Sequence, residues 1–325
     1  MRIAFVVDPL AQLKPEKDSS IALMRSAAKR GHEVYAIEST SIHWRDNRQR
    51  VKASTKPKTV FGEALRLKLD LSELDNWHEV TQRERLALNA FDTVLMRKDP
   101  PFNFDYVSLT WLLSRAEAEG ARVYNSPQAL REHSEKVAVS EFTTFSVPTI
   151  ISRDAGMIDD FIHQEQEVIV KPLDGMGGEE VYRLTPVDPN RNMILESITR
   201  NGARLVMAQR YVPQIKEGDK RVFLIDGAVA PWCLARLPKE GETRANLMAG
   251  GIGVARELSA RDQAIAEALA PTLAARGLFL VGIDIIGDYL TEINVTSPTC
   301  MVEIEQQSGF SVADKTIEAL EAHFR

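Results

Sequence analysis

The sequence predicts an open α/β domain followed by an α+β domain, and three observations support this prediction. Strand and helix patterns alternate over residues 1–126, whereas antiparallel hairpin patterns dominate residues 127–325. The length of 325 residues fits about two domains of ordinary size. A hydrophobic content of 44% with 26% charged residues is typical of globular domains that bury their own cores.

Composition excludes several classes of protein. With 40 Lys and Arg residues against 46 Asp and Glu, the net charge is −6, and no long basic run indicates nucleic-acid binding. No segment approaches the roughly 18 consecutive apolar residues of a membrane span. The two cysteines, Cys233 and Cys300, are too few for a disulfide framework or a Cys-rich zinc site. We therefore expect a reduced, cytoplasmic protein without nucleic-acid or membrane partners.

The first domain opens with a β-α-β pattern. Residues 3–7 form a continuous apolar and β-branched run, as expected for a strand that is buried on both faces. Asp18-Ser19-Ser20 supplies N-cap chemistry for a helix over residues 21–30, and residues 34–37 follow as a second strand. Chirality then favours a right-handed crossover and a parallel sheet.

The remainder of the first domain is less regular in sequence. Residues 93–96 and 122–124 are predicted to be strands, with a helix over residues 106–119 between them. Residues 43–90 are charged and weakly patterned. We therefore interpret this long segment as a surface excursion from the sheet, and its basic residues as a solvated face.

Beyond residue 127 the pattern changes to hairpins. Residues 128–142 are predicted to form a helix, and Asp226-Gly227 is a strong two-residue hairpin signal. The predicted strands are 168–171, 205–209, 222–225, 228–230, 280–286 and 290–295. We expect these strand runs to form antiparallel sheets without long helices between them.

A glycine-rich turn directly follows the first of these strands. Lys171 ends the strand, and Gly175, Met176, Gly177 and Gly178 form the turn. Glycines let backbone N–H groups approach an anion closely, and a lysine supplies a charge for phosphate. The spacing matches neither a P-loop nor a dinucleotide-binding fingerprint. A phosphate-binding loop and a flexible hairpin tip with a solvated lysine both remain open.

Oxygen donors gather on the last hairpin. Glu292 and Asn294 are two residues apart and therefore share one face of their strand. A three-residue loop ending at Tyr289 would pair Asp284 with Glu292, whereas a two-residue loop would place Asp284 opposite Thr291. Two carboxylates and an amide suit Mg²⁺, which fills its other positions with phosphate and water. We adopt the first register and predict a magnesium site, the alternative being a polar sheet edge.

Arginines and a second glycine-rich tract complete the second domain. Arg221, Arg236 and Arg244 suit bidentate recognition of phosphate or carboxylate, although surface arginines would fit the pattern as well. Residues 241–253 contain four glycines in thirteen residues and few apolar anchors. This composition indicates either a mobile lid that excludes water or a plain linker.

A further candidate site lies in the first domain. Arg97 directly follows the strand over residues 93–96, and Asp18 and Ser20 begin the first helix. Ligands of open α/β sheets bind at the carboxyl ends of strands, with anions at helix N-termini. Arg97 is therefore a candidate carboxylate clamp, and a structural or solvated arginine is the alternative.

Taken in order, these segments resemble the ATP-grasp superfamily and, within it, the bacterial glutathione synthetase family. The most specific strings are Met96-Arg97-Lys98-Asp99-Pro100-Pro101 and Glu292-Ile293-Asn294-Val295-Thr296-Ser297-Pro298-Thr299. Further matching segments are 8–9, 17–20, 171–178, 217–221, 234–236, 241–244 and 284–288. Ala245 and Ile252 depart from the glycine and the basic residue that are usual in this family's lid, and Glu179 replaces a small residue.

The resemblance implies an ATP-grasp fold over residues 127–325, preceded by a substrate-binding α/β domain over residues 1–126. The implied parts of the ATP-grasp domain are a small subdomain with the glycine-rich loop (127–212) and a catalytic subdomain (213–325) with a mobile lid loop (237–253). The implied reaction joins γ-glutamylcysteine to glycine through an acyl phosphate, giving glutathione, ADP and phosphate. ATP is the co-substrate, Mg²⁺ or Mn²⁺ the metal, and a homo-oligomer, often a tetramer, the expected assembly.

The resemblance also assigns roles to individual residues. Catalysis falls to Lys171, Arg236 and Arg244. The residues expected to hold ATP are Lys136, Lys171, Gly175, Met176, Gly177, Gly178, Gln209, Arg210, Tyr211, Val212, Asp219 and Arg236. The expected metal ligands are Asp284, Glu292 and Asn294. The residues expected to position the dipeptide are Asp18, Ser20, Arg97, Asn294, Ser297 and Thr299.

Two alternative functions use the same fold. Another carboxylate–amine ligase would share the chemistry but not the substrate, and Arg97 with Ser297-Pro298-Thr299 argues against it. A non-catalytic nucleotide-binding homologue would be expected to lose a metal ligand or a phosphate lysine. The sequence keeps both kinds of residue.

Overall fold

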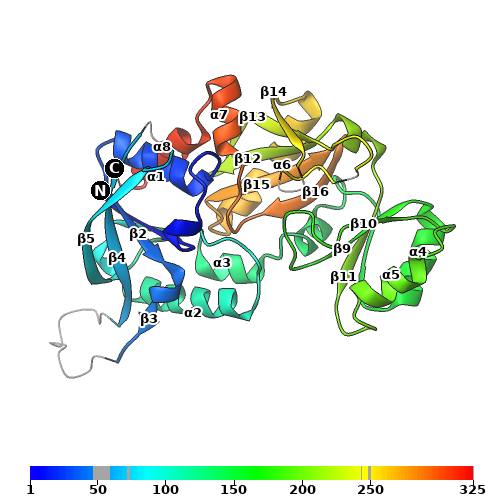
Figure 1. The fold of residues 1–325 in the computed structure, drawn as a ribbon, viewed down its shortest axis with the longest axis horizontal. Helices are drawn as coiled ribbons and strands as arrows, with labels where there is room; N and C mark the ends of the chain where they lie inside the picture. Colours follow the sequence, from blue (N-terminus) through cyan, green and yellow to red (C-terminus); the bar gives the residue numbers. More distant parts are fainter. Residues whose placement is uncertain (47–58, 72–73, 243, 248–249, 325) are drawn as a thin grey trace.

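The computed structural model describes residues 1–46, 59–71, 74–242, 244–247 and 250–324. These residues form three β-sheets that follow one another along the long axis of the molecule (Figure 1). The sheet of the N-terminal domain lies at one end, a four-stranded sheet lies at the other, and a five-stranded sheet lies between them. The predicted succession of an α/β part and an α+β part is confirmed.

The N-terminal sheet is built on parallel strands that are buried on both faces. Its central strand β1 pairs in parallel with β2 on one side and β6 on the other. Helix α1 packs on one face and α2 on the other, as the division of the core side chains shows. The bounds are β1 (Arg2–Val7), α1 (Ser19–Lys29), β2 (Glu33–Glu38), β6 (Thr93–Met96), α2 (Phe104–Ala118) and β7 (Val123–Tyr124).

The segment interpreted as a surface excursion is instead part of this sheet. β3 (His43–Trp44), β4 (Val60–Leu69) and β5 (His78–Ala87) extend it by antiparallel pairing. The interpretation failed because β4 alternates buried apolar residues with charged ones, and β5 is an edge strand exposed over most of its length. Residues 47–58, which carry several of the basic residues, lie outside the described residues.

The four-stranded sheet carries the glycine-rich loop between two of its strands. Its order is β10-β9-β11-β8, and α4 and α5 cover it. The bounds are β8 (Thr149–Ser152), α4 (Ala155–Glu165), β9 (Val168–Pro172), β10 (Tyr182–Leu184), α5 (Arg191–Ile198) and β11 (Val206–Arg210). Ahead of it, the helix predicted over residues 128–142 is divided into α3 (Pro127–Glu132) and a 3₁₀ helix, Val137–Phe142. The break leaves Glu135 and Lys136 outside regular helix.

The five-stranded sheet is antiparallel throughout, in the order β14-β13-β12-β15-β16. The expectation that no long helix interrupts its strands is wrong, because the alanine-rich α6 joins β14 to β15. The bounds are β12 (Asp219–Ile225), β13 (Ala228–Leu237), β14 (Ile252–Glu257), α6 (Ala260–Ala275), β15 (Leu280–Ile286), β16 (Tyr289–Asn294), α7 (Met301–Ser308) and α8 (Val312–Ala322). No described helix is long and apolar enough to cross a bilayer.

The predicted turn and register of the two hairpins can be compared with the structure residue by residue. Asp226 and Gly227 both adopt positive φ, 49° and 80°, as the predicted two-residue turn requires. In the second hairpin Asp284 pairs with Glu292, as predicted, but for another reason. The loop between Ile286 and Tyr289 has two residues, and a register shift beyond Asp284 supplies the extra residue.

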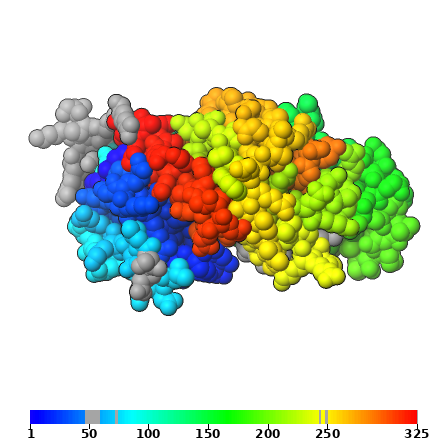
Figure 2. Space-filling view, turned by 90° about the horizontal axis from the view of Figure 1, so that it is seen from above, coloured from blue at the N-terminus to red at the C-terminus, as the bar shows by residue number. Residues whose placement is uncertain are grey.

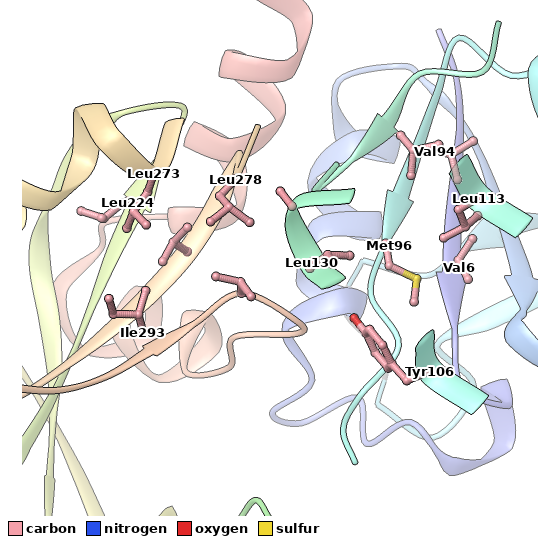
Figure 3. Close-up of a cluster of buried hydrophobic side chains, with 14 of the residues drawn as sticks. Val6, Val94, Met96, Tyr106, Leu113, Leu130, Leu224, Leu273, Leu278 and Ile293 are labelled. Atoms are coloured by element: carbon pink, nitrogen blue, oxygen red, sulfur yellow. The ribbon is translucent and has the colours of Figure 1, made fainter. Parts of the chain in front are cut away.

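A continuous core joins the N-terminal domain to the five-stranded sheet. Val6, Met96 and Tyr106 belong to the same buried cluster as Leu224 and Ile293, and α3 lies between the two groups (Figure 3). The C-terminal helices α7 and α8 return to the N-terminal domain (Figure 2). There Arg30 of α1 forms a two-pronged ion pair with Glu321 of α8. The shared buried cluster and the C-terminal helices therefore join the two domains.

We expect the buried His133 to make the protein less stable in mild acid. Burial, aided by the charge of Arg276, lowers the pKa of His133 to about 4. In the unfolded chain the histidine side chain has a pKa of about 6.5. Unfolding at a pH between the folded and unfolded pKa values therefore takes up a proton. The free energy of unfolding should fall by about 2–3 kcal/mol between pH 7 and pH 4.5 from this residue alone. Urea unfolding of wild type, His133→Leu and the exposed control His163→Leu at both pH values measures it. A fall of equal size in all three proteins would contradict the prediction.

Candidate active site

A cavity of about 630 Å³ is lined by residues of the four-stranded and five-stranded sheets and by the segments that follow β1 and β6 of the N-terminal sheet. Most of the residues proposed from the sequence line it. They are Asp18, Lys136, Lys171, Gly175, Met176, Gly177, Gly178, Gln209, Arg210, Tyr211, Val212, Asp219, Arg236, Arg244, Asp284, Glu292, Asn294, Ser297 and Thr299. Two others, Ser20 and Arg97, lie behind the lining.

Two lysines stand at the glycine-rich loop. Lys136 Nζ lies 3.0 Å from Glu292 Oε1 and donates to the Gly175 carbonyl at 2.8 Å. Burial alone would lower the pKa of Lys136, but the Glu292 carboxylate outweighs burial and raises it. Lys171, on β9, has no ion pair among the described residues, and burial lowers its pKa. One lysine is therefore fixed in place, and the other is an enclosed cation available to a ligand.

A network of two aspartates and two arginines forms the floor of the cavity. Arg221 holds Asp284 with two hydrogen bonds of 2.5 and 3.0 Å, and Arg236 Nη2 lies 2.9 Å from the same carboxylate. Arg236 also donates to Asp219 at 2.6 Å. Burial would raise the pKa of Asp284, but the two guanidinium groups hold it well below its usual range. Burial raises the pKa of Asp219 to about 6, although Arg236 opposes the shift.

The predicted metal ligands are brought together, but they are not equally accessible. Asn294 donates to Asp284 Oδ2 and to the Gly282 carbonyl, each at 3.2 Å, which leaves its own oxygen available. Asp284 faces arginines, so Glu292 and Asn294 present the more accessible oxygens. The described residues contain no group of three or more His, Cys, Asp or Glu suited to a metal. Two carboxylates and one amide still fit a magnesium-like ion that takes its remaining ligands from phosphate and water.

The far end of the cavity is apolar. Tyr211, Ile215 and Ala245 form a buried cluster against Ile169 and Ile286. Ala245, which stands where the family usually has glycine, is only 3% exposed. Its buried methyl group therefore anchors its own segment of the chain to this cluster. This apolar enclosure lies in the same cavity as Lys136 and Lys171, and it suits a nucleotide base.

The predicted lid is shorter than expected and touches the glycine-rich loop. Leu237 belongs to β13, and Ile252 and Gly253 pair with that strand, so the sheet fixes both ends. Arg244 donates to the Gly178 carbonyl at 3.4 Å. A Cβ at Gly178 would lie 2.8 Å from Asn246 Oδ1, so glycine permits the close approach. Lid residues 243 and 248–249 lie outside the described residues.

The end of the cavity at the N-terminal domain is organised by Asp18 and Arg97. Asp18 Oδ1 caps α1 by accepting from the backbone N–H groups of Ser20 and Ile21 at 2.7 and 3.1 Å. Arg97, 4% exposed, donates to Ser20 Oγ at 3.2 Å and to the Pro298 carbonyl at 3.1 Å. Through these contacts Arg97 links the two domains. Its action as a direct carboxylate clamp stays a prediction.

Glu135 was not selected from the sequence, and Arg221 was named there only as a possible phosphate or carboxylate ligand. Glu135 Oε1 accepts hydrogen bonds from the N–H groups of Val295 and Thr296 at 2.8 and 3.0 Å and from Thr296 Oγ1 at 2.9 Å. It fixes the end of β16, yet nothing in its local sequence signals this. Arg221 was noted as an arginine but not placed at the site. Its position two residues after Asp219 on one strand face could have revealed it.

Comparison with solved structures defines the class. The chain superimposes on the D-cycloserine synthetase DcsG with a TM-score of 0.66 at 14% identity, over 99% of this chain and 100% of that one. It superimposes on the ATP-grasp ligase PsnB in complex with minimal precursor, Mg and ADP with a TM-score of 0.60 at 17% identity, over 98% and 97% of the two chains. The fold is therefore that of the ATP-grasp ligases.

Sequence comparison defines the family within that class. Models of the N-terminal and ATP-grasp domains of prokaryotic glutathione synthetase match residues 1–131 and 135–309. Glutathione synthetases from Ralstonia nicotianae and Nitrosomonas europaea are 50% and 49% identical to the chain over 99% of its length, and 95% and 98% of their own. The enzyme from Pseudomonas aeruginosa is 44% identical over 99% of this chain and 98% of its own length. The chain belongs to the prokaryotic glutathione synthetase family and is an ATP-dependent ligase.

Proposed function

We propose that the cavity described above is where this ligase joins γ-glutamylcysteine to glycine at the expense of ATP. The protein is a glutathione synthase, as its match to relatives of that name over nearly the full chain supports. The observation that supports this proposal best is one cavity that combines an apolar end, the lysines Lys136 and Lys171, and a floor of paired arginines and aspartates. No side-chain nucleophile is required, and neither cysteine is assigned a role in the reaction.

The basic groups suit a reaction that passes through an acyl phosphate. The terminal carboxylate of the dipeptide attacks the γ-phosphate of ATP, and the glycine amine then displaces phosphate from the acyl carbon. Lys136 and Lys171 would hold the phosphates, and Arg236 and Arg244 would stabilise the transferred phosphoryl group. Gly175 to Gly178 would cover the phosphates with backbone N–H groups.

The remaining residues suit binding of ATP, metal and dipeptide. A divalent cation, Mg²⁺ or Mn²⁺, would neutralise phosphate charge when bound by Asp284, Glu292 and Asn294. The residues proposed to enclose the nucleoside are Gln209, Arg210, Tyr211, Val212 and Asp219. Those proposed to position the dipeptide are Asp18, Ser297 and Thr299, with Ser20 and Arg97 acting from behind the lining. A cytoplasmic location is proposed, in keeping with two unpaired buried cysteines, and a homo-oligomer is proposed from the family resemblance alone.

Phosphate release from ATP and Mg²⁺ tests the proposal directly. Release should need γ-glutamylcysteine, and full turnover should need glycine as well, with glutathione as the product identified by mass. Turnover only with other carboxylate–amine pairs would keep the fold and the chemistry but discard the substrate. ATP binding without turnover under any pairing would show a non-catalytic homologue.

We expect Lys171→Met to separate stability from activity. The lysine charge is enclosed without an ion pair, and burial lowers its pKa, so its removal should raise the free energy of unfolding by about 0.5–1 kcal/mol. The same change removes a phosphate contact and should raise the KM for ATP at least about tenfold. Urea unfolding and initial rates against ATP concentration measure the two effects. A stabilised variant with an unchanged KM would remove Lys171 from the ATP site.

A further inference from the structure

The cavity ends where the N-terminal sheet reverses its strand order. β1 lies between β2 and β6, so the chain leaves β1 toward one side and the later strand lies on the other. Ligands of open α/β sheets bind at such a point, beyond the carboxyl ends of the strands. Asp8 follows β1, and Lys98 and Asp99 follow β6, and all three line the cavity.

Three aspartates line this end of the cavity; both oxygens of Asp8 and one oxygen of Asp18 already accept hydrogen bonds. Asp8 accepts from Lys98 Nζ at 3.0 Å and from the Asp99 backbone N–H at 2.8 Å, one bond to each oxygen. Asp18 caps α1. The Asp99 carboxylate accepts a hydrogen bond from Ser297 and has no ion pair among the described residues. Of these three aspartates, Asp99 therefore has the most capacity left for a ligand.

The position of Asp99 is costly without a cationic partner. Burial raises the pKa of Asp99, although Ser297 and the charge of Arg97 oppose the shift. Arg97 is turned toward Ser20 and Pro298 instead. An ammonium group entering the cavity would restore the missing opposite charge and form a charge-assisted hydrogen bond.

The proposed reaction says which ammonium group could reach this end. The cysteine carboxylate of the dipeptide must lie beside Lys136 and Arg236, because it receives the phosphoryl group. The γ-glutamyl head then points toward the N-terminal sheet. It carries an α-ammonium and an α-carboxylate, and the cavity offers both an unpaired carboxylate and lysines, Lys14 and Lys17, at this end.

We propose that Asp99 is the counter-ion of the α-ammonium group of the γ-glutamyl residue and so selects γ-glutamyl substrates over acyl-cysteines that lack this amine. The inference rests on the proposed function. Ser297 holds the carboxylate in place, which links recognition of the substrate's head to the loop that follows β16. Asp99 is a specificity residue on this view, and it takes no part in phosphoryl transfer.

Two substrates that differ only in the amine test the inference. We would compare kcat/KM for γ-glutamylcysteine and for N-glutaryl-cysteine, which lacks the α-amino group, in wild type, Asp99→Asn and the exposed control Asp105→Asn. Wild type and the control should prefer the amine about 10- to 100-fold, as expected for a charge-assisted hydrogen bond. Asp99→Asn should lose most of this preference through KM for the natural dipeptide. Its rate with N-glutaryl-cysteine should be equal or higher, since no unpaired charge is left.

Other outcomes would overturn the inference, and each can be distinguished from a failure of the proposed function. If wild type makes glutathione but uses both substrates equally, no residue recognises the amine, and this result does not depend on the folding of any variant. If Asp99→Asn keeps the full preference, or Asp18→Asn removes it instead, Asp99 is not the counter-ion. If wild type forms no glutathione at all, the proposed function itself fails. The KM for ATP of Asp99→Asn should match wild type, and its melting temperature should be equal or higher, because the variant buries no unpaired carboxylate.

Discussion

Replacing Glu292 by Gln should lower turnover by about two to three orders of magnitude while the protein remains folded. The Glu292 carboxylate is more accessible than that of Asp284, and its oxygen lies 3.0 Å from Lys136 Nζ. Burial alone would raise the pKa of Glu292, but the charges of Lys136 and Lys171 outweigh burial and lower it. Glutamine keeps the shape and one oxygen but removes the charge that balances both lysines and a divalent cation.

Rates measured against free Mg²⁺ concentration identify the cause of the loss. A metal ligand should show both a lower maximal rate and a higher Mg²⁺ requirement in Glu292→Gln. The control is Glu267→Gln on the exposed face of α6, which should behave as wild type. An unchanged rate at limiting Mg²⁺ would show that the metal assignment is wrong. A lower rate with an unchanged Mg²⁺ requirement would assign Glu292 to lysine positioning alone.

The sequence predicted the architecture well where periodicity and turn chemistry agree. The β-α-β start, the Asp226-Gly227 turn and the pairing of Asp284 with Glu292 are all present. The pairing, however, follows from a two-residue loop and a register shift, which cannot be read from residue types. The edge strand β5 was missed because it is polar on both faces, and its position is decided by pairing with β4.

The sequence predicted which residues line the cavity better than it predicted what their side chains contact. Most of the proposed residues line one cavity, yet Asp284 faces two arginines and Arg97 lies behind the wall. Such distinctions depend on side-chain rotation and on partners distant in sequence. Glu135 is the clearest case, since it acts on residues about 160 positions away, at Val295 and Thr296. Local patterns contain no information on such a contact.

Asp284→Asn should be the most damaging substitution for the fold among the residues of the site. The amide would leave Arg221 buried without its counter-ion and Arg236 with Asp219 as its one remaining carboxylate partner. Breaking a buried pair in this way costs about 3–5 kcal/mol, because an uncompensated charge remains in the interior. Turnover should fall below detection in the same variant, since both the arginine at the phosphate and a proposed metal oxygen are disturbed.

A double-mutant cycle separates the two effects of this substitution. Arg221→Met in the Asp284→Asn background removes the cation that has lost its partner, and should recover about 1–3 kcal/mol of the lost stability. Turnover should not recover, because neither arginine placement nor the carboxylate oxygen is restored. Urea unfolding and glutathione formation are measured on all four proteins of the cycle. Additive stability losses would mean that Arg221 and Asp284 do not act as a pair. Recovery of turnover along with stability would reduce Asp284 to a structural residue, and the metal site would then depend on Glu292 and Asn294 alone.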